Sequence, residues 1–267
     1  MKILTYNING LKAFNEKGLL DKLFNDFFDV DVFCFQEVKT DYKTVTDIFS
    51  KYSDINWYYD ENTAKRGYAG TLTAWKNDIM FVPCNTGIAL HSDIPFDSSQ
   101  TNYWFGRYVL TYHNGFNLVN VYVPNSGKKE LLREAFDESL LYNLTNIHSD
   151  MPLIIVGDMN VCSTELDYWG NYDKSLDTCP GLMRFEINGF HKLLDSGFVD
   201  IYRELNTDNR KYSYFPVRAK NSVENNKGWR LDYALVDKEH KDIVKSIDII
   251  SGYNGADHSP VVIDIDV

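Results

Sequence analysis

Residues 153–160 read LIIVGDMN, a run of four branched aliphatic residues that ends on small and polar ones. Such a run is typical of the middle of a buried β-strand. Side chains two residues apart in an extended strand face the same side, so Asp158 and Asn160 can act on one atom. The preceding Gly157 lets another backbone or a substrate approach closely. The stretch therefore predicts a strand that ends on a functional pair.

Other strands are predicted where β-branched and aromatic residues gather. Together with LIIVG (153–157) they are ILTYNI (3–8), VDVFCF (30–35), TLTAWK (71–76), RYVLTYH (107–113), FNLVNVYV (116–123), RLDYALV (230–236) and VVIDIDV (261–267). Two of them are separated only by Asn114 and Gly115, a type I′ hairpin signal, so that pair is antiparallel. Helices are predicted at 15–28, 128–148 and 182–195, where apolar residues recur at helical spacing. Helices and hairpins together indicate a mixed α/β sheet rather than a purely parallel one.

The chain has 267 residues, of which 44% are hydrophobic and 15% aromatic, enough for a substantial core. No repeat, low-complexity tract or long linker divides it, so one domain spanning 1–267 is the simplest interpretation. The four cysteines form no C-x-x-C pair, which argues against a zinc site or a disulfide framework. No apolar segment is long enough to cross a membrane, and we expect a soluble intracellular protein, either cytoplasmic or nuclear.

Carboxylates, amides, a phenol and an imidazole stand at or near the ends of six predicted strands. In chain order they are Asn7, Asn9, Gln36, Glu37, Tyr122, Asn125, Asp158, Asn160, Asp232, Asp257 and His258. Each one taken singly has an ordinary alternative as a turn or cap residue. If the strands gather in one or two sheets, the groups converge on one rim, where α/β folds often bind ligands.

The chemistry of these groups points to phosphate esters. Carboxylates such as Glu37 and Asp158 are hard oxygen ligands, which suit Mg²⁺ or Mn²⁺ better than zinc. Asp158 can accept a proton from water while Asn160 orients that water. His258 can carry a positive charge, and a buried carboxylate such as Asp232 would hold its tautomer and raise its pKa. A metal, an activated water and a cationic imidazole together indicate hydrolysis of a phosphate ester.

Seven motifs in order resemble the exonuclease III family of class II apurinic/apyrimidinic (AP) endonucleases, within the endonuclease/exonuclease/phosphatase superfamily. They are NING (7–10), FQEVK (35–39), GYAG (67–70), NVYVPNSG (120–127), GDMN (157–160), GWRLDY (228–233) and ADHSP (256–260). The resemblance covers nearly the whole chain. It implies a four-layered, DNase I-like α/β sandwich, in which two mixed, mostly antiparallel sheets pack face to face with helices outside.

The resemblance also implies a metal site and groups near the scissile phosphate. Glu37 matches the main Mg²⁺ ligand, with Asn7 and Asp257 near the metal, and Mn²⁺ can substitute. Tyr122 and Asn125 match groups close to the phosphate that is cut. All five are expected to lie at one end of the sheets.

The remaining matches assign the proton chemistry. Asp158 matches the residue that activates the attacking water, and Asn160 matches its orienting partner. His258 and Asp232 match an imidazole and carboxylate that stabilise the phosphate charge. Whether Asp158 or Tyr122 is the general base stays open.

Aromatic residues near the C-terminal motifs match the pocket for a flipped-out abasic sugar. Trp229 matches one wall, and Tyr214 or Phe215 in YSYF (212–215) another. Apolar walls would exclude a nucleotide that bears a base, and an abasic site costs little to extrude. The alternative for each aromatic residue is ordinary core packing.

Charge is distributed unevenly. The net charge is −11, yet residues 208–230, which end on Arg230, hold six Lys and Arg against two acids. Further basic islands include Lys128 and the stretch KRGY (65–68), which ends on Tyr68. These features predict a DNA-facing stripe, for which the alternative is a scattered solvated surface.

One region departs from the family. The family commonly has a Thr-Pro-x-Glu-Arg element near residues 183–187, where this chain reads MRFEI, and the segment before it carries Tyr168 and Trp169. Substrate preference is therefore open, including the balance of endonuclease and exonuclease activity and DNA against RNA.

Three hypotheses follow. The first is a Mg²⁺-dependent, monomeric AP endonuclease that cuts double-stranded DNA 5′ to an abasic site and leaves a 3′-hydroxyl. Activity as a 3′-phosphodiesterase and a 3′→5′ exonuclease would accompany it. The second is another phosphodiesterase of the superfamily, acting on RNA or small phosphate esters. The third is a catalytically inactive nucleic-acid-binding relative.

Overall fold

A computed structural model describes residues 1–93, 103–113, 115–147, 149–216 and 221–267. One sheet contains β1 (Lys2–Asn7), β2 (Val32–Gln36), β3 (Ile55–Asp60), β4 (Thr71–Lys76), β11 (Val244–Ile249) and β12 (Val261–Ile265). The other contains β5 (Phe81–Thr86), β6 (Tyr108–His113), β7 (Asn117–Tyr122), β8 (Leu153–Asp158), β9 (Phe198–Asp200) and β10 (Asp232–Asp237).

The helices divide into two groups. The N-terminal helices are α1 (Leu11–Glu16), α2 (Leu19–Asp26) and α3 (Tyr42–Phe49). The later ones are α4 (Glu130–Thr145), α5 (Tyr172–Ser175), α6 (Arg184–Asp195) and α7 (Ile201–Leu205), with 3₁₀ turns η2 (Glu165–Asp167) and η3 (Lys238–Ile243). None of the helices described is long and apolar enough to cross a bilayer.

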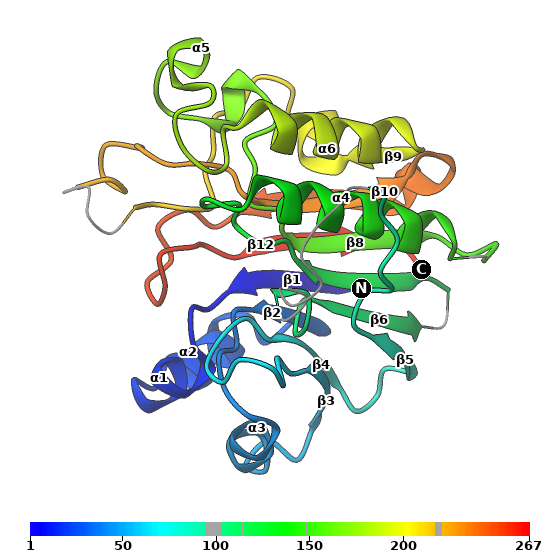
Figure 1. The fold of residues 1–267 in the computed structure, drawn as a ribbon. Coiled ribbons are helices and arrows are strands. Elements are labelled where there is room, and N and C mark those ends of the chain that lie inside the picture. The colour runs from blue at the N-terminus through cyan, green and yellow to red at the C-terminus, as the bar shows by residue number, and fades with distance from the viewer. Residues whose placement is uncertain (94–102, 114, 148, 217–220) are drawn as a thin grey trace.

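The two sheets stack at the centre of the molecule, with strand orders β11-β12-β1-β2-β4-β3 and β5-β6-β7-β8-β10-β9. Helices α1 to α3 cover the outer face of the first sheet, and α4 and α6 cover that of the second (Figure 1). Both sheets are mixed, with β1–β2 and β7–β8 as their parallel pairs. The predicted four-layered α/β sandwich is confirmed.

Alternation along the strands builds three apolar layers. In β8, Leu153 and Ile155 pack towards α4 and α6, whereas Ile154 and Val156 pack between the two sheets. A strand buried on both faces has no need for polar alternation, which explains the run LIIV. Gly157 follows with a φ of +139°, and a Cβ there would lie 1.9 Å from the carbonyl oxygen of Val121 on β7. The glycine is therefore required by the close approach of the β7 backbone.

A buried polar contact fixes the two sheets next to the strand ends. The side-chain amide of Gln36 at the end of β2 donates to Asn120 Oδ1 on β7 at 2.7 Å. Asn120 in turn donates to the carbonyl oxygen of Leu72 on β4 at 2.9 Å. Both amides are fully buried, so an alternative sheet packing would leave them without partners. This contact holds β2 and β7 in one register just behind Glu37 and Tyr122.

All eight predicted strands are present, but four strands were not predicted. These are β3, β5, β9 and β11. The helix predicted at 15–28 is two helices, because Gly18 between them adopts a left-handed φ of +70°. Strands β6 and β7 are antiparallel as predicted. Of the two hairpin residues, Asn114 lies outside the described part of the chain.

Candidate active site

The strand ends meet at one edge of the sandwich because of strand register. Tyr122 at the end of β7 stands opposite Asp158 at the end of the parallel strand β8. On its other side, Asp158 stands opposite Asp232 at the start of the antiparallel strand β10. Asn7 ends β1 of the other sheet, and its amide donates to Asp158 Oδ2 at 2.9 Å. Both sheets therefore contribute to one site.

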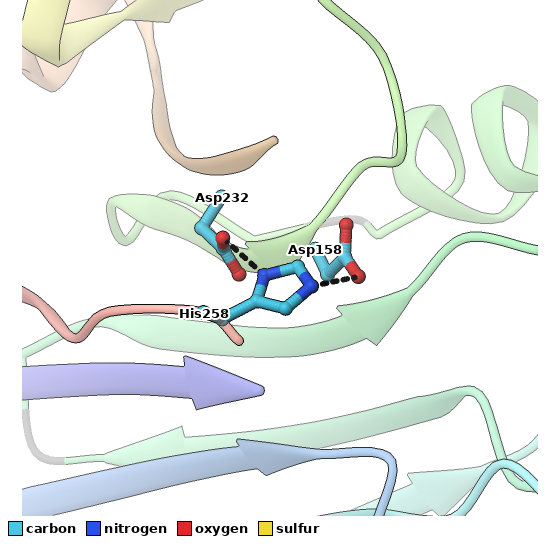
Figure 2. Close-up of side chains that lie close together, drawn as sticks. All are labelled: Asp158, Asp232 and His258. Carbon is cyan, nitrogen blue, oxygen red and sulfur yellow. Dashed lines mark hydrogen bonds and ion pairs between the residues drawn. The ribbon is translucent and has the colours of Figure 1, made fainter. Parts of the chain in front are cut away.

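His258 lies between two carboxylates. Figure 2 shows its imidazole with Nδ1 facing Asp232 and Nε2 facing Asp158, at 2.7 Å and 3.8 Å from their nearest oxygens. Ser213 fixes the backbone of Asp232 and of Ser259, the residue that follows His258. Its hydroxyl accepts the backbone N–H of Asp232 at 3.0 Å, and its carbonyl accepts that of Ser259 at 2.6 Å. The pair His258–Asp232 is thus fixed before any substrate binds.

Burial and charge shift the pKa values of this group in a useful direction. Burial alone would lower the pKa of His258, but the carboxylates of Asp232 and Asp158 outweigh it and raise that pKa to about 10. Burial raises the pKa of Asp158 to about 7, although the nearby His258 opposes that shift. At neutral pH the imidazole is therefore cationic, and Asp158 lies close to its own pKa, as suits a general base.

Asn160 and Asn125 complete the polar surface around Asp158. The backbone N–H of Asn160 donates to Asp158 Oδ1 at 2.9 Å, and its side-chain amide donates to Asp158 Oδ2 at 3.2 Å. The side-chain amide of Asn125 donates to Asn160 Oδ1 at 3.4 Å. Asn160 adopts a φ of +49°, a left-handed conformation that non-glycine residues seldom take. Such backbone strain is common at functional sites.

Glu37 occupies the opposite side of the same site, also in a left-handed conformation with a φ of +53°. Its Oε1 accepts from the Tyr122 hydroxyl at 2.8 Å and from the Asn7 amide at 3.2 Å, and its Oε2 contacts the ammonium of Lys39. Burial would raise the pKa of Glu37, but Lys39, Tyr122 and Asn7 outweigh it and lower that pKa. Burial and the charge of Glu37 raise the pKa of Tyr122 well above its usual value. Tyr122 is therefore a neutral hydrogen-bond donor.

A cavity of about 300 Å³ opens over these groups. Glu37, Tyr122, Asn125, Asp158, Asn160, Asp257 and His258 line its polar part. Its apolar part includes Tyr214, Trp229 and Leu231. Gly181, with a φ of +91°, allows the Trp229 ring to come so close that a Cβ would be 3.0 Å from it. A polar floor thus adjoins an aromatic wall.

Comparison with known proteins agrees with this geometry. Residues 4–258 match the model of the endonuclease/exonuclease/phosphatase family. The chain belongs to this family. It is 30% identical to an exodeoxyribonuclease of Bacillus subtilis over the full length of both chains. It is 28% identical to a DNA-(apurinic or apyrimidinic site) endonuclease of Dictyostelium discoideum, covering 100% of this chain and 71% of the relative.

A solved structure shows the same fold. The AP endonuclease of Leishmania major superimposes with a TM-score of 0.84 at 27% identity, covering 98% of this chain and 86% of that one. The resemblance stated from the seven motifs is confirmed at the level of the family.

Two groups of side chains around the cavity offer ligand atoms to a metal ion. Asp158, Asp232 and His258 offer ligand atoms within 4.8 Å of one another. A protonated imidazole repels a cation, however, and the raised pKa of His258 keeps it protonated. The ionised carboxylate of Glu37 already holds a cation, the Lys39 ammonium, and therefore fits a metal better. Asp257 faces the same cavity and accepts from Asn9 at 3.1 Å.

Two predicted DNA contacts are corrected by the structure. Arg230 is 0% exposed, and its guanidinium pairs with Asp167 and Asp200, so it cannot reach DNA. Phe215 is 5% exposed and packs beside Tyr212, away from the cavity. Of the two residues considered for the second wall, only Tyr214 lines the cavity.

The other predicted contacts lie at the surface. Lys128 is exposed just beyond Asn125. Tyr68 is partly exposed, with the Lys65 ammonium 4.3 Å from its ring centroid. Within the basic segment 208–230, Arg218 and Lys220 lie outside the described residues.

Two buried arginines that support the site were not predicted. Arg107 places its guanidinium 4.5 Å from the ring centroid of Tyr122 and donates to the Tyr122 carbonyl at 3.1 Å. Arg133 on α4 donates to the carbonyls of Pro124 and Met159 at 2.9 and 3.0 Å, and so holds the chain after β7 and β8. Neither belongs to a recognisable motif. Arg107 precedes an apolar strand, which is a weak signal, and Arg133 lies in the charged stretch KKELLRE (128–134), which gives none.

Proposed function

We propose that the protein is a Mg²⁺-dependent AP endonuclease that hydrolyses the phosphodiester 5′ to an abasic site and leaves a 3′-hydroxyl. The observation that carries this proposal is the cavity, in which a hydrolytic set of side chains lies beside an aromatic wall. The AP endonuclease names of relatives that match nearly the whole chain support it.

The proton chemistry is assigned to Asp158. Its pKa of about 7 suits removal of a proton from water, and it faces the cavity together with Asn160. Tyr122 is the poorer base, since its raised pKa keeps the phenol protonated. In this proposal Asn160 orients the water, and Tyr122 and Asn125 lie near the phosphate, to which the Tyr122 hydroxyl donates a hydrogen bond.

His258 is assigned to charge stabilisation. Its imidazolium lies in the cavity wall. Its positive charge would stabilise the negative charge that builds up on the phosphate during hydrolysis. Asp232 keeps that imidazole protonated and oriented through the 2.7 Å bond to Nδ1. Removal of either partner is expected to disable the pair.

The residues proposed to hold a Mg²⁺ ion are Glu37, Asn7 and Asp257, with Mn²⁺ as a substitute. All three offer oxygen ligands, which these ions prefer. When bound, the metal would supply Lewis-acid stabilisation of phosphate oxygens. Lys39 contacts Glu37 through an ordinary flexible side chain, so its ammonium can give way to an ion.

The aromatic wall is assigned to recognition of the lesion. Trp229 and Tyr214 leave room for a sugar without a base, and extruding such a residue from the duplex costs little. Tyr68 and Lys128, both at the surface, are proposed to contact the DNA as well. The same floor could accept a blocked 3′ terminus, which accounts for the proposed 3′-phosphodiesterase and 3′→5′ exonuclease activities.

The organisation of the protein is proposed to be simple. A single domain spanning 1–267 that acts as a monomer is proposed, since the polar and aromatic groups assigned to the reaction meet in one cavity of the chain. A DNA-repair role places the protein inside the cell, in the cytoplasm or nucleus.

The decisive experiment uses duplex DNA with one tetrahydrofuran abasic analogue. We expect nicking 5′ to the analogue with Mg²⁺, none with EDTA, and none by Asp158→Asn. Asp208→Asn, an exposed acid outside the cavity, is the matched control and should nick normally. Cleavage of RNA but not of abasic DNA would contradict the proposal, and so would tight DNA binding without cleavage.

A further inference from the structure

Trp169 is an exposed indole beside the cavity that no step of the proposed reaction uses. Its side chain is 43% exposed, an unusual position for so large an apolar ring. Its neighbour Tyr168 packs edge-on against Trp229, with ring centroids 5.0 Å apart, and Trp229 is the cavity wall. The three rings therefore lead from the cavity outward to the surface.

Hydrogen bonds hold the backbone around Trp169 in place, and this keeps the indole ring at the surface. The N–H of Trp169 donates to the carbonyl of Gly228 at 3.1 Å. Arg210 donates to the carbonyl of Tyr168 at 3.3 Å. Two residues earlier, Asp167 is buried in ion pairs with arginines. A rigidly mounted exposed aromatic ring loses little conformational entropy when it binds a ligand.

Positive charge flanks the ring on a protein that is acidic overall. The Lys227 ammonium lies 5.3 Å from the Trp169 ring centroid, and Arg210 reaches the same loop. The net charge of the whole chain is −11, so local cations at an exposed indole point to an anionic, aromatic ligand. Nucleic acid combines a phosphate for the cation with a base face for the indole.

We propose that Trp169 is a stacking platform for an unpaired nucleobase next to the cavity, with Lys227 contacting its phosphate. This inference rests on the proposed function only in that DNA is the ligand. A base inside a duplex is already stacked on its neighbours, so Trp169 can gain only from a base that is unpaired. The platform therefore favours single-stranded or frayed DNA over fully paired DNA.

The test measures binding in EDTA, where nothing is cut. Two single-stranded ligands of the same length are compared by fluorescence anisotropy, one an ordinary oligodeoxynucleotide and the other a tetrahydrofuran-phosphate strand without bases. The base preference is the affinity for the strand with bases divided by the affinity for the baseless strand, which the cavity can accept in every variant. Trp169→Ala should lower this preference about tenfold, the scale of one stacked base, and leave the affinity for the baseless strand unchanged.

Two further variants make the result specific. Trp169→Phe keeps an aromatic face and should retain most of the preference. Phe28→Ala removes another exposed aromatic side chain, 76% exposed, and should change nothing. A Trp169→Ala protein that keeps the preference would overturn the proposal, since the bases would then bind elsewhere. Equal weakening of both ligands by Trp169→Ala would also overturn it.

The outcome is separable from that of the proposed function. If the wild type fails to nick abasic duplex DNA with Mg²⁺ but Trp169→Ala lowers the base preference, the endonuclease proposal fails and the platform stands. If the wild type nicks such DNA but Trp169→Ala leaves the base preference unchanged, the platform fails alone.

Discussion

Two buried clusters of charged side chains in the molecule differ in how completely the charges within each cluster are paired. The structural cluster consists of Asp167, Asp200, Arg203 and Arg230. In it, Asp167 Oδ1 accepts from Arg230 at 2.7 Å and from Arg203, while its Oδ2 accepts from Thr164 at 2.9 Å. Two acids meet two arginines. The arginines outweigh the effect of burial and lower the pKa of Asp167.

The second cluster, called the catalytic cluster for its proposed role, consists of Asp158, Asp232 and His258, and it remains incompletely paired. Two carboxylates share one imidazole, and Asp232 Oδ1 is buried with no hydrogen-bond partner among the described residues. The pKa of Asp158 is raised to about 7 rather than lowered. A cluster that serves stability satisfies its own charges, whereas this one retains capacity for a substrate and a proton.

The largest expected effect concerns the catalytic cluster. His258→Ala removes the cation between the two carboxylates, and we expect kcat on abasic duplex DNA to fall by at least about 10²-fold. Single-turnover nicking with saturating enzyme measures this. The variant should still unfold cooperatively, so near-normal turnover would remove His258 from the proposed mechanism.

A substitution in the structural cluster should lower the stability of the fold and leave kcat nearly unchanged. Arg230→Met leaves Asp167 and Asp200 buried without that partner, which is expected to cost about 3–5 kcal/mol of unfolding free energy. Urea denaturation measures the loss. At a temperature where the variant is folded, kcat should stay within a few-fold of wild type. A stable but inactive variant would show that Arg230 acts in catalysis after all.

The pH dependence of stability in EDTA should separate the clusters by sign. The pKa of Asp158 is raised to about 7, so the folded state loses stability as the pH rises from about 4 to about 7. Asp158→Asn removes that loss, and its Tm should exceed the wild-type Tm by about 3 °C or more at pH 8 but not at pH 4.

For Asp167 the sign is reversed. Its pKa is lowered, so its contribution to stability is present above the ordinary carboxyl pKa and is lost as the pH falls through the folded value. Asp167→Asn should therefore be strongly destabilising at pH 7 and less so in acid. Thermal melts of both variants across this pH range provide the measurement, and parallel curves would contradict the distinction.

The smallest effect is expected at the surface. Lys211 pairs with Asp248 at 2.5 Å, but both side chains are substantially exposed to water. Because solvent screens such pairs, Lys211→Ala should change Tm by less than about 2 °C. A larger shift would show that exposure does not distinguish this pair from the structural cluster.

Much of the site could be predicted because its signals are local. The strand LIIV ends on Asp158 wherever it lies in the fold, and Glu37 and His258 likewise belong to short motifs. Their convergence could only be expected conditionally, since it depends on strand register. The register Asp158 opposite Asp232 comes from pairing between strands far apart in sequence.

The errors have a common physical cause. Arg230 was counted with its basic neighbours, but distant carboxylates of Asp167 and Asp200 bury it. Strand β5 was not predicted because it contains Pro83 and lies at a sheet edge, with most of its residues exposed. Trp169 stands in a segment that departs from the family pattern, but only the structure shows that the Lys227 ammonium lies next to it. Tertiary partners decide such positions, and local sequence does not contain them.

The bond from Asn7 to Asp158 joins two different sheets, and it has a consequence for the cell. An enzyme that cuts DNA is dangerous if it works before it can recognise its target. Here neither sheet by itself holds both the proposed metal ligand Glu37 and the proposed base Asp158. A half-folded or partly unfolded chain therefore lacks the complete proposed site, and we expect cutting to begin only when the two halves of the sandwich have met.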